Sequence, residues 1–386
     1  MQFELDEEQK LLRDTVRDVL ARSYDNEKRK AAVESERGWT ESVWKQFAEL
    51  GLLGLSFAED DGGMDAGPVE TFAVMTEIGR RLAPEPLLDC VLIPGGLITE
   101  VGSTDQRQRI LPGVAEGQTL LAFAHSEPGT RWPAAEVSTS ATEDLREGRR
   151  PAGSGGSWAL SGVKNPVLHG DCADHFVISA ALPGGGVGLF LVAADAEGLT
   201  RKTYRTHDGL RGASLELSDV AGEPLGDGGD ASAAIVASNV RAQAALAAET
   251  LGAMEESLRL TTEYLKQRKQ FGVPLAKFQA LTFRAADMYV QLELARSMAL
   301  YATMSLADGS PDPTVASRAK LQIGRSARQI GQESIQLHGG IGVTDEYPVG
   351  HYFSRLTAIE HTLGGVDDHL RVITSSLKDH EMLGVS

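Results

Sequence analysis

The sequence is poor in cysteine and has no long apolar run. Cys90 and Cys172 are its two cysteines, and they can pair only if the fold brings them together, which the sequence does not indicate. Reduced thiols in a cytoplasmic protein are therefore the simpler expectation. No run of about 18 apolar residues occurs, so no membrane span is expected. The acidic opening segment also lacks the basic and apolar regions of a signal peptide.

Basic charge is also scarce. The 386 residues include 37 Lys and Arg against 54 Asp and Glu, which gives a net charge of −17. Nucleic-acid binding needs a basic footprint, so this balance argues against it. An anionic cofactor or substrate would have to be met by local cations, because the overall field repels it.

Two glycine-containing segments suggest where such local binding occurs. Arg268-Lys269-Gln270-Phe271-Gly272 and Gln336-Leu337-His338-Gly339-Gly340 each close a long helical pattern. An arginine offers a planar fork of donors that matches phosphate oxygens. Glycines let backbone N–H groups approach an anion closely. Together the segments predict a site for a cofactor that carries a diphosphate.

The periodicity divides the chain into three expected domains. Residues 1–118 are mostly helical, with apolar residues at three- and four-residue spacing. Residues 119–229 hold short apolar runs and predict a small β-domain, including a hairpin around Pro183-Gly184-Gly185-Gly186. Residues 230–386 return to long helical patterns. Residues 144–156 are polar and are expected to form an exposed loop.

The last domain is expected to be a four-helix bundle. After a first long helix, helical patterns cover Phe278–Leu306 and Thr314–His338, with a turn at Asp308–Pro313 between them. One more helix follows Gly365. Long helices joined by short turns are typical of antiparallel bundles.

These domains carry specific motifs in a recognisable order. The motifs are Leu50-Gly51-Leu52-Leu53-Gly54-Leu55, Glu59-Asp60-Asp61-Gly62-Gly63, Ser126-Glu127-Pro128, Trp158-Ala159-Leu160-Ser161-Gly162-Val163-Lys164, Gly209-Leu210-Arg211-Gly212-Ala213-Ser214, the two segments at Arg268 and Gln336, and Glu346-Tyr347-Pro348-Val349. In these motifs the chain resembles the acyl-CoA dehydrogenase family over essentially its full length. The resemblance implies an α+β fold: an N-terminal helical domain, a middle β-domain and a C-terminal four-helix bundle.

The resemblance also implies a cofactor, partners and site residues. FAD would bind between the β-domain and the bundle, with a neighbouring subunit completing the site. The residues implied for the cofactor are Arg268, Phe271, Gln279, Gln336, Gly339, Gly340 and, near a flavin carbonyl, Ser126. The substrate would be an acyl-CoA thioester, dehydrogenated between its α- and β-carbons. An electron-transfer flavoprotein would receive the electrons.

The family's carboxylate base has no clear counterpart. Laying the family's Tyr-Glu-Gly-Thr motif on the sequence by eye matches Glu360, whereas counting without gaps from Glu346 places Leu363 at the base position. The count also keeps the following helix in register, and Glu360 would then serve only if the loop shifts. His361 is a further candidate, since imidazole takes protons near neutral pH. A second family location falls on Ala242, which has no ionisable group.

The β-domain departs from the family near the flavin ring. After Glu127-Pro128 the family's Gly-Ser-Asp is missing, and Lys164 is followed by Asn165-Pro166-Val167-Leu168-His169 where the family has Trp-Ile-Thr. Leu168 has no hydroxyl to bond the flavin. Pro166 removes a backbone donor and can alter the strand.

Three functional interpretations follow. The first is an FAD-dependent acyl-CoA dehydrogenase. The second is a catalytically reduced subunit of a homo- or hetero-oligomer that completes another chain's flavin site. The third is a relative that uses flavin as an oxidase or hydroxylase. Asp367, Asp368 and His369 superficially suggest a metal site, but adjacent helical residues point in different directions. They are expected to form a solvated helix face, and no metal is expected.

Overall fold

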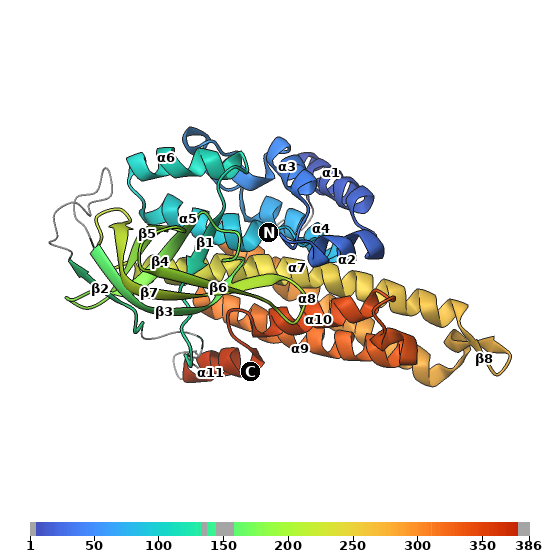
Figure 1. Ribbon diagram of the computed structural model, residues 1–386. Coiled ribbons are helices and arrows are strands. Elements are labelled where there is room, and N and C mark those ends of the chain that lie inside the picture. The colour runs from blue at the N-terminus through green and yellow to red at the C-terminus, as the bar shows by residue number, and fades with distance from the viewer. Residues whose placement is uncertain (1–4, 131, 133–136, 144–157, 310, 377–386) are drawn as a thin grey trace. The chain divides into compact units, whose positions relative to one another are not determined.

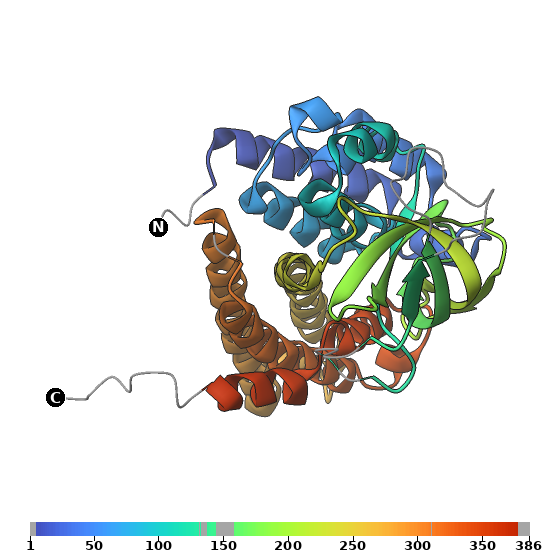
Figure 2. The same cartoon turned by 90° about the vertical axis from the view of Figure 1, so that its left-hand side faces the viewer.

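The computed structural model describes residues 5–130, 132, 137–143, 158–309 and 311–376. The chain folds into many helices and a larger sheet (Figures 1 and 2). It divides into two compact units. The first comprises residues 1–27, 72–83 and 243–386, and the second comprises residues 28–71 and 84–242. Among the described residues, no helix has both the length and the apolar character that crossing a membrane requires.

The first unit is a helical bundle. Its elements are α1 (Glu7–Ser23), the second half of α4 (Pro68–Arg81), most of α7 (Ser232–Gln267), β8 (Lys269–Gln270), β9 (Val273–Pro274), η4 (Leu275–Lys277), α8 (Gln279–Ala307), α9 (Pro313–His338), η5 (Gly339–Val343), α10 (Val349–His361) and α11 (Val366–Ser376). Apolar residues of α7, α8, α9 and α10 share one core, with Leu251, Met288, Ile330 and Leu356 at most 1% exposed.

Close helix packing in this unit depends on two glycines. A Cβ on Gly79 of α4 would lie 1.8 Å from the carbonyl oxygen of Glu249 on α7. A Cβ on Gly252 of α7 would lie 1.9 Å from the carbonyl oxygen of Thr76 on α4. The two helices therefore touch backbone to backbone, which any larger residue would prevent.

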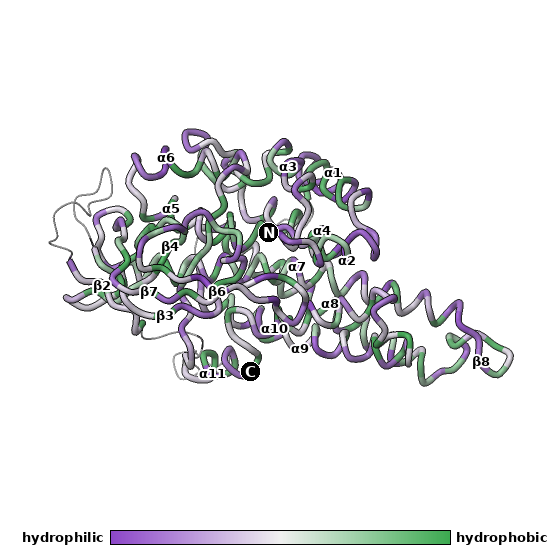
Figure 3. Tube along the Cα trace, in the orientation of Figure 1, coloured by the Kyte–Doolittle hydropathy of each residue, from purple (hydrophilic) through white to green (hydrophobic). Residues whose placement is uncertain are grey.

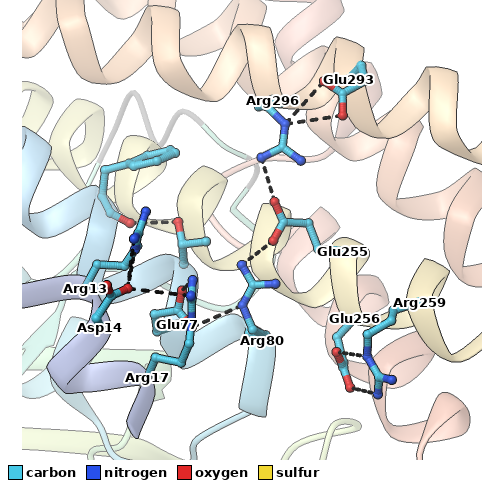
Figure 4. A network of polar contacts seen from close by, with 12 residues as sticks. Arg13, Asp14, Arg17, Glu77, Arg80, Glu255, Glu256, Arg259, Glu293 and Arg296 are labelled. Carbon is cyan, nitrogen blue, oxygen red and sulfur yellow. Dashed lines mark hydrogen bonds and ion pairs between the residues drawn. The ribbon is translucent and has the colours of Figure 1, made fainter. Parts of the chain in front are cut away.

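A charge network joins four helices of the same unit (Figure 4). Glu77 on α4 is 1% exposed and accepts hydrogen bonds from Arg17 of α1 at 2.7 Å and Arg80 of α4 at 3.1 Å. Arg80 also pairs with Glu255 on α7, which accepts from Arg296 on α8 at 2.6 Å. Glu77 and the partly buried Glu255 thus have two cationic partners each, which offset the cost of removing their charge from water.

The second unit combines short helices with a sheet. Its helices are α2 (Asn26–Glu34), α3 (Glu41–Glu49), η1 (Leu52–Gly54), η2 (Glu59–Asp61), the start of α4, the π-helical turn η3 (Leu88–Leu92), α5 (Ile93–Val101), α6 (Thr104–Ala115) and the start of α7. Helix α5 is rich in apolar residues, as the green along it in Figure 3 shows. Residues Leu97 and Ile98 of α5 are fully buried.

The sheet closes on itself. Its strands are β1 (Leu121–Ala124), β2 (Ser140–Glu143), β3 (Trp158–Leu168), β4 (His175–Ala181), β5 (Val187–Ala193), β6 (Leu199–Arg205) and β7 (Arg211–Pro224). The order is β1-β4-β2-β3-β7-β5, with β6 on β7, and β5 also pairs with β4. Between Lys164 and Val167 the β3–β7 register shifts, at the place where Pro166 lacks an N–H.

Most of the expected elements are confirmed, and one was missed. The predicted hairpin is β4–β5, and the helices expected at Phe278–Leu306 and Thr314–His338 are α8 and α9. The sequence analysis missed α10, which packs on α9 ahead of α11, so the bundle domain holds more than four helices. The expected loop at residues 144–156 lies outside the described residues.

Candidate cofactor site and the loop after the tenth helix

Arg268 directly follows the last turn of α7. Its N–H donates to the carbonyl of Tyr264 at 2.8 Å, and its own carbonyl accepts from Leu275 N–H at 2.8 Å. The hairpin β8–β9 lies between these contacts and turns at Phe271 and Gly272, which have φ of 52° and 82°. Positive φ at both central residues is typical of the tight turns that suit hairpins. The hairpin thus fixes the backbone from which the Arg268 side chain extends.

The glycine segment begins where α9 ends. Gly339 has φ 66° and ψ −142°, a conformation that residues with a Cβ rarely adopt. No atom lies within 4 Å of the position that a Cβ would take on Gly339 or on Gly340. The backbone of η5 therefore faces open space on this side.

The two segments border one pocket of about 570 Å³, within the range typical of ligand sites. It is lined by Tyr264, Arg268, Gln270, Leu275, Leu281, Arg284, Gln336, Leu337, His338, Gly339, Gly340 and Ile341. The structure thus brings Arg268, Gln336, Gly339 and Gly340 together, as the sequence analysis expected.

The two arginines of the pocket differ in charge balance. Arg284 on α8 donates to Glu333 at 2.5 Å, so its charge is neutralised. For Arg268, no side-chain hydrogen bond or ion pair is found within the described part of the chain. An unneutralised guanidinium beside two open glycines fits a diphosphate group, which is bound by such forks and by backbone N–H groups.

An aromatic cluster lies beside the pocket. The rings of Tyr264 and His338 are 4.6 Å apart, and those of His338 and Tyr347 are 4.9 Å apart. His338 donates from Nδ1 to the carbonyl of Ser334 at 2.7 Å, and burial lowers the pKa of its ring. The imidazole is thus held neutral in a fixed orientation.

Two of the expected cofactor residues in this unit, Phe271 and Gln279, do not line this pocket. Phe271 lies at the hairpin tip, 91% exposed, with its ring 6.2 Å from that of Phe278. Gln279 begins α8 and is exposed. Within one copy of the chain, neither side chain joins Arg268 and Gly339 around the pocket.

The end of α10 separates the two positions that the competing alignments give to the base, and the further candidate His361 is the last residue of that helix. Glu360 lies in the last turn of α10, whereas Leu363 and Gly364 follow the helix with φ of 55° and 94°. The Leu363 carbonyl accepts from Gln243 Nε2 at 3.2 Å and from His369 Nε2 at 3.0 Å. The Leu363 backbone is therefore held by hydrogen bonds that do not depend on its side chain.

Glu360 is associated instead with a buried lysine. Lys320 on α9 donates from Nζ to the carbonyls of Ile359 at 2.6 Å and Glu360 at 3.4 Å. Burial lowers the pKa of Lys320 to about 7, and the charge of Glu360 opposes that shift. Lys320 thus satisfies carbonyls at the end of α10, as cations near a helix C-terminus do.

The expected solvated face of α11 is only partly correct. Asp367 is exposed, and Asp368 accepts from Gly365 N–H at 3.0 Å at the start of the helix. His369, however, is fully buried, because its ring turns inward to the Leu363 carbonyl. Among the described residues, no group of three or more His, Cys, Asp or Glu is placed to hold a metal ion.

In the second unit, Ser126 lies beside a buried ion pair. Its carbonyl accepts from Asn165 N–H at 2.8 Å. Lys164, fully buried on β3, donates to Glu127 at 2.7 Å, to Ser179 at 3.1 Å and to the carbonyl of His125 at 3.2 Å. Glu127 also accepts from the N–H groups of Ser138 and Thr139 at 2.7 and 2.9 Å. The Ser-Glu-Pro motif is thus tied to β3.

The pKa values in this cluster follow from burial and pairing. Burial alone would raise the pKa of Glu127, but hydrogen bonds from Lys164, Thr139 and Ser138 lower it to about 2. Burial lowers the pKa of Lys164 to about 8, against the attraction of Glu127. His125 contacts Ser179 at 2.9 Å, and burial lowers its pKa to about 4. The pair is charged and the histidine neutral near pH 7.

We expect acid to destabilise the fold before the carboxylates titrate. Burial lowers the pKa of His125 and, with the charge of Lys320, that of His369 from 6.5 to about 4. Between these values the unfolded chain binds more protons, so stability is full above pH 6.5 and falls toward pH 4. The loss is about 3 kcal/mol for each histidine. Urea unfolding at the two ends of this window measures it, and an unchanged loss in His125→Gln would contradict the assignment.

Several residues around the loop were missed by sequence reasoning. Lys320 lies on the apolar stripe formed by Ala316, Ala319 and Ile323 on α9. A lysine at such a position in the sequence indicates a buried charge that needs a partner. Gln243 and His369 gave no comparable signal, because their partner is a backbone carbonyl distant in sequence.

Two domain models of one protein family match the chain. A sequence model of the acyl-CoA dehydrogenase N-terminal domain matches residues 6–118, and one of the C-terminal domain matches residues 238–377. The acyl-CoA dehydrogenase IpdE2 of Mycobacterium tuberculosis is 31% identical over 379 residues, which cover 96% of this chain and 98% of that protein.

Solved structures agree with the sequence relatives. A variant of the Tcur3481–Tcur3483 steroid ACAD is 33% identical, with a TM-score of 0.87, over 97% of this chain and 98% of that one. The ChsE4–ChsE5 complex from Mycobacterium tuberculosis is 25% identical, with a TM-score of 0.87, over 99% of this chain and 100% of that one. The chain therefore belongs to the acyl-CoA dehydrogenase family of FAD-dependent oxidoreductases.

Proposed function

We propose that this chain is a subunit of an FAD-dependent oxidoreductase that dehydrogenates an acyl-CoA thioester between its α- and β-carbons and passes the electrons to an electron-transfer flavoprotein. The observation that carries the proposal is the unneutralised guanidinium of Arg268 in the same pocket as Gly339 and Gly340. This donor set is the one that a cofactor diphosphate requires.

Different residues would bind different parts of the cofactor. Arg268, Gln336 and the backbone of Gly339 and Gly340 would hold the diphosphate, and the aromatic and apolar lining would exclude water from it. Phe271 and Gln279 would serve the adenine end of a cofactor, and Ser126 a flavin carbonyl. When bound, FAD supplies the acceptor for the hydride that leaves the β-carbon.

Replacing Arg268 with glutamine is expected to weaken binding of FAD, and of ADP alone, about 10- to 100-fold. Hydrogen bonds to charged groups contribute about 1.5–3 kcal/mol each, and Arg284, which also lines the pocket, is already paired with Glu333. Titration calorimetry with each ligand measures the change. Because ADP carries the diphosphate but no flavin, its titration measures binding at the diphosphate site without the flavin end.

The pocket supplies its own control for that experiment. Arg284→Gln removes a guanidinium that Glu333 already neutralises, so a change in affinity of about threefold or less is expected. Equal losses of affinity in the two arginine variants would contradict the proposed role of Arg268.

The backbone donors have a matched pair of variants. Gly340→Ala in the pocket and Gly96→Ala on α5 each add a methyl group where the fold leaves open space. Gly340→Ala should lower the affinity for ADP, and Gly96→Ala should not.

A second function is favoured by the loop and by α8: a catalytically reduced subunit that completes a partner's flavin site. Leu363 offers no proton acceptor at the position that the sequence count gives to the base. Glu360 belongs to α10, with its Cγ 3.6 Å from the Cβ position of Gly324 on α9. A base contributed by another chain would explain why this one keeps a diphosphate pocket without a carboxylate at Leu363.

Helix α8 presents a second apolar face on which such a partner can pack. Phe283, Val290, Leu294 and Tyr301 are 64%, 54%, 46% and 37% exposed. Their spacing places them on one stripe, opposite the buried Met288, Leu292 and Ala299. An exposed apolar stripe on a helix that also faces the core is typical of an interaction surface. The similar chain of the ChsE4–ChsE5 structure is part of a complex, which supports a heteromer.

The flavin content of the purified chain separates the two functions. We expect the chain alone to bind less than one FAD per subunit and to reach full occupancy only after co-expression with a flavin-binding relative. Absorbance at the flavin maximum and size-exclusion chromatography measure both. A fully loaded preparation of this chain alone that reduces an electron acceptor with an acyl-CoA would rule out the reduced-subunit function.

A further inference from the structure

The two cysteines of the chain lie in contact within the second unit. Cys90 belongs to η3, and Cys172 follows β3, with its Sγ 3.3 Å from the carbonyl oxygen of His169. The two thiols lie close enough to shift each other's pKa and are not joined as a disulfide. The fold thus brings together two cysteines that are 82 positions apart in the sequence.

The two sulfurs occupy different environments. Cys90 is 0% exposed, whereas Cys172 is partly exposed. Burial raises the pKa of the Cys90 thiol well above its usual value, so Cys90 remains a donor. The neighbouring Cys90 thiol lowers the pKa of Cys172, and the burial of Cys172 opposes this shift. Solvent access and thiolate character therefore coincide on Cys172.

A buried cation strengthens this difference. His169 is 4% exposed, and its Nδ1 lies 2.8 Å from Asp89 Oδ2. Burial alone would lower the pKa of His169, but Asp89 raises it, and the resulting positive charge favours the Cys172 thiolate. The indole N–H of Trp39 also lies near this sulfur, although without good hydrogen-bond geometry. Reactive cysteines occupy partly exposed, electropositive surroundings of this kind.

Packing alone does not explain these neighbours. A structural cysteine behaves as a small apolar residue, for which apolar surroundings suffice. Here an imidazole paired with Asp89, an indole N–H and a second thiol lie near one sulfur. These three groups favour a negative charge on Cys172, against the opposing charge of Asp171.

We propose that Cys172 is a peroxide-reactive thiol and that Cys90 is its resolving partner, so that the pair forms a reversible disulfide within the chain. Hydrogen peroxide is the oxidant. The Cys172 thiolate attacks one peroxide oxygen, the O–O bond breaks, and the sulfenic acid forms with release of water after protonation. Cys90 then attacks Cys172 Sγ, its proton leaves with the hydroxyl as a second water, and the S–S bond forms. Two electrons pass from the thiols to one peroxide.

The test uses the folded full-length chain and intact-mass spectrometry. After treatment with stoichiometric hydrogen peroxide, we expect a mass loss of two hydrogen atoms that a thiol reductant reverses. Because the chain has two cysteines, that loss in a monomeric species identifies the pair. Free thiols after treatment, under conditions that oxidise the urea-unfolded chain, would overturn the proposal.

Variants assign the roles of the two sulfurs. With the sulfenic-acid reagent dimedone present, Cys90→Ser should trap an adduct on Cys172, whereas Cys172→Ser should give none on Cys90. His169→Gln should slow oxidation of Cys172 about tenfold, as expected for loss of one unit of pKa depression. An adduct that forms first on Cys90 would reverse the assignment. If Cys90→Ser does not fold, the mass measurement on the unsubstituted chain still decides whether the pair forms.

Discussion

Replacing Lys164 with methionine is expected to lower the free energy of unfolding by about 3–5 kcal/mol. Lys164 is fully buried and donates to Glu127 at 2.7 Å, so its loss leaves a buried carboxylate without its cation. Glu127 would keep the N–H groups of Ser138 and Thr139, which reduce the penalty without removing it. Urea unfolding near pH 7 measures the change.

Two further variants isolate the buried charge. Lys202→Met, on β6 of the same sheet, removes a lysine that pairs with Glu216 while 65% exposed, so a loss below about 1 kcal/mol is expected. Lys164→Met combined with Glu127→Gln should recover part of the stability, because no unpaired charge then remains. If the double variant is as unstable as the sum of the single ones, packing rather than the ion pair holds this site together.

The elements that the sequence predicted well are those with local determinants. The apolar period of α8 and α9 and the Asp308–Pro313 turn between them fix both helices to within a residue or two. The glycines at Gly184–Gly186 likewise predicted the β4–β5 hairpin, whose strands are close in sequence. In each case, spacing and turn residues contain the needed information.

The elements that the sequence analysis missed depend on distant contacts. Closure of the sheet needs β5 to pair with both β4 and β7, and no local pattern specifies two partners. Helix α10 is short and is buried on α9 mainly through Tyr352, Leu356 and Ile359, so its pattern is weak. Tertiary packing decides such elements more than local propensity does.

The candidate site divides in the same way. Arg268 and Gly339-Gly340 could be identified because donor type and glycine content are properties of short segments. The contacts around the loop at Leu363 could not, since Gln243, Lys320 and His369 reach backbone carbonyls from three other helices. The difference between Glu360 and Leu363 was visible in the sequence only as two competing alignments. The structure assigns one to a helix and the other to the loop.

Replacing Leu363 with glutamate is expected to raise the rate of α-proton exchange of an acyl-CoA thioester by about 10²- to 10⁴-fold, the contribution of a positioned general base. The loop backbone is held through the Leu363 carbonyl by Gln243 and His369, so the side chain can change without releasing it. Glutamate, like leucine, is unbranched at Cβ, so the positive φ of 55° costs it no more. Exchange of the α-hydrogen for deuterium measures proton removal without requiring hydride transfer.

The matched variants are Leu363→Gln and Glu360→Gln, measured with straight-chain, branched and steroid side-chain thioesters. Leu363→Gln keeps the size and lacks the proton acceptor, so it should remain at the level of the unsubstituted chain. Glu360→Gln should leave the exchange rate unchanged, because Glu360 lies within α10 and not in the loop. Exchange already present in the unsubstituted chain and abolished by Glu360→Gln would make Glu360 the base after all. The loop would then have to move during catalysis, because Glu360 precedes the left-handed turn at Leu363 and Gly364.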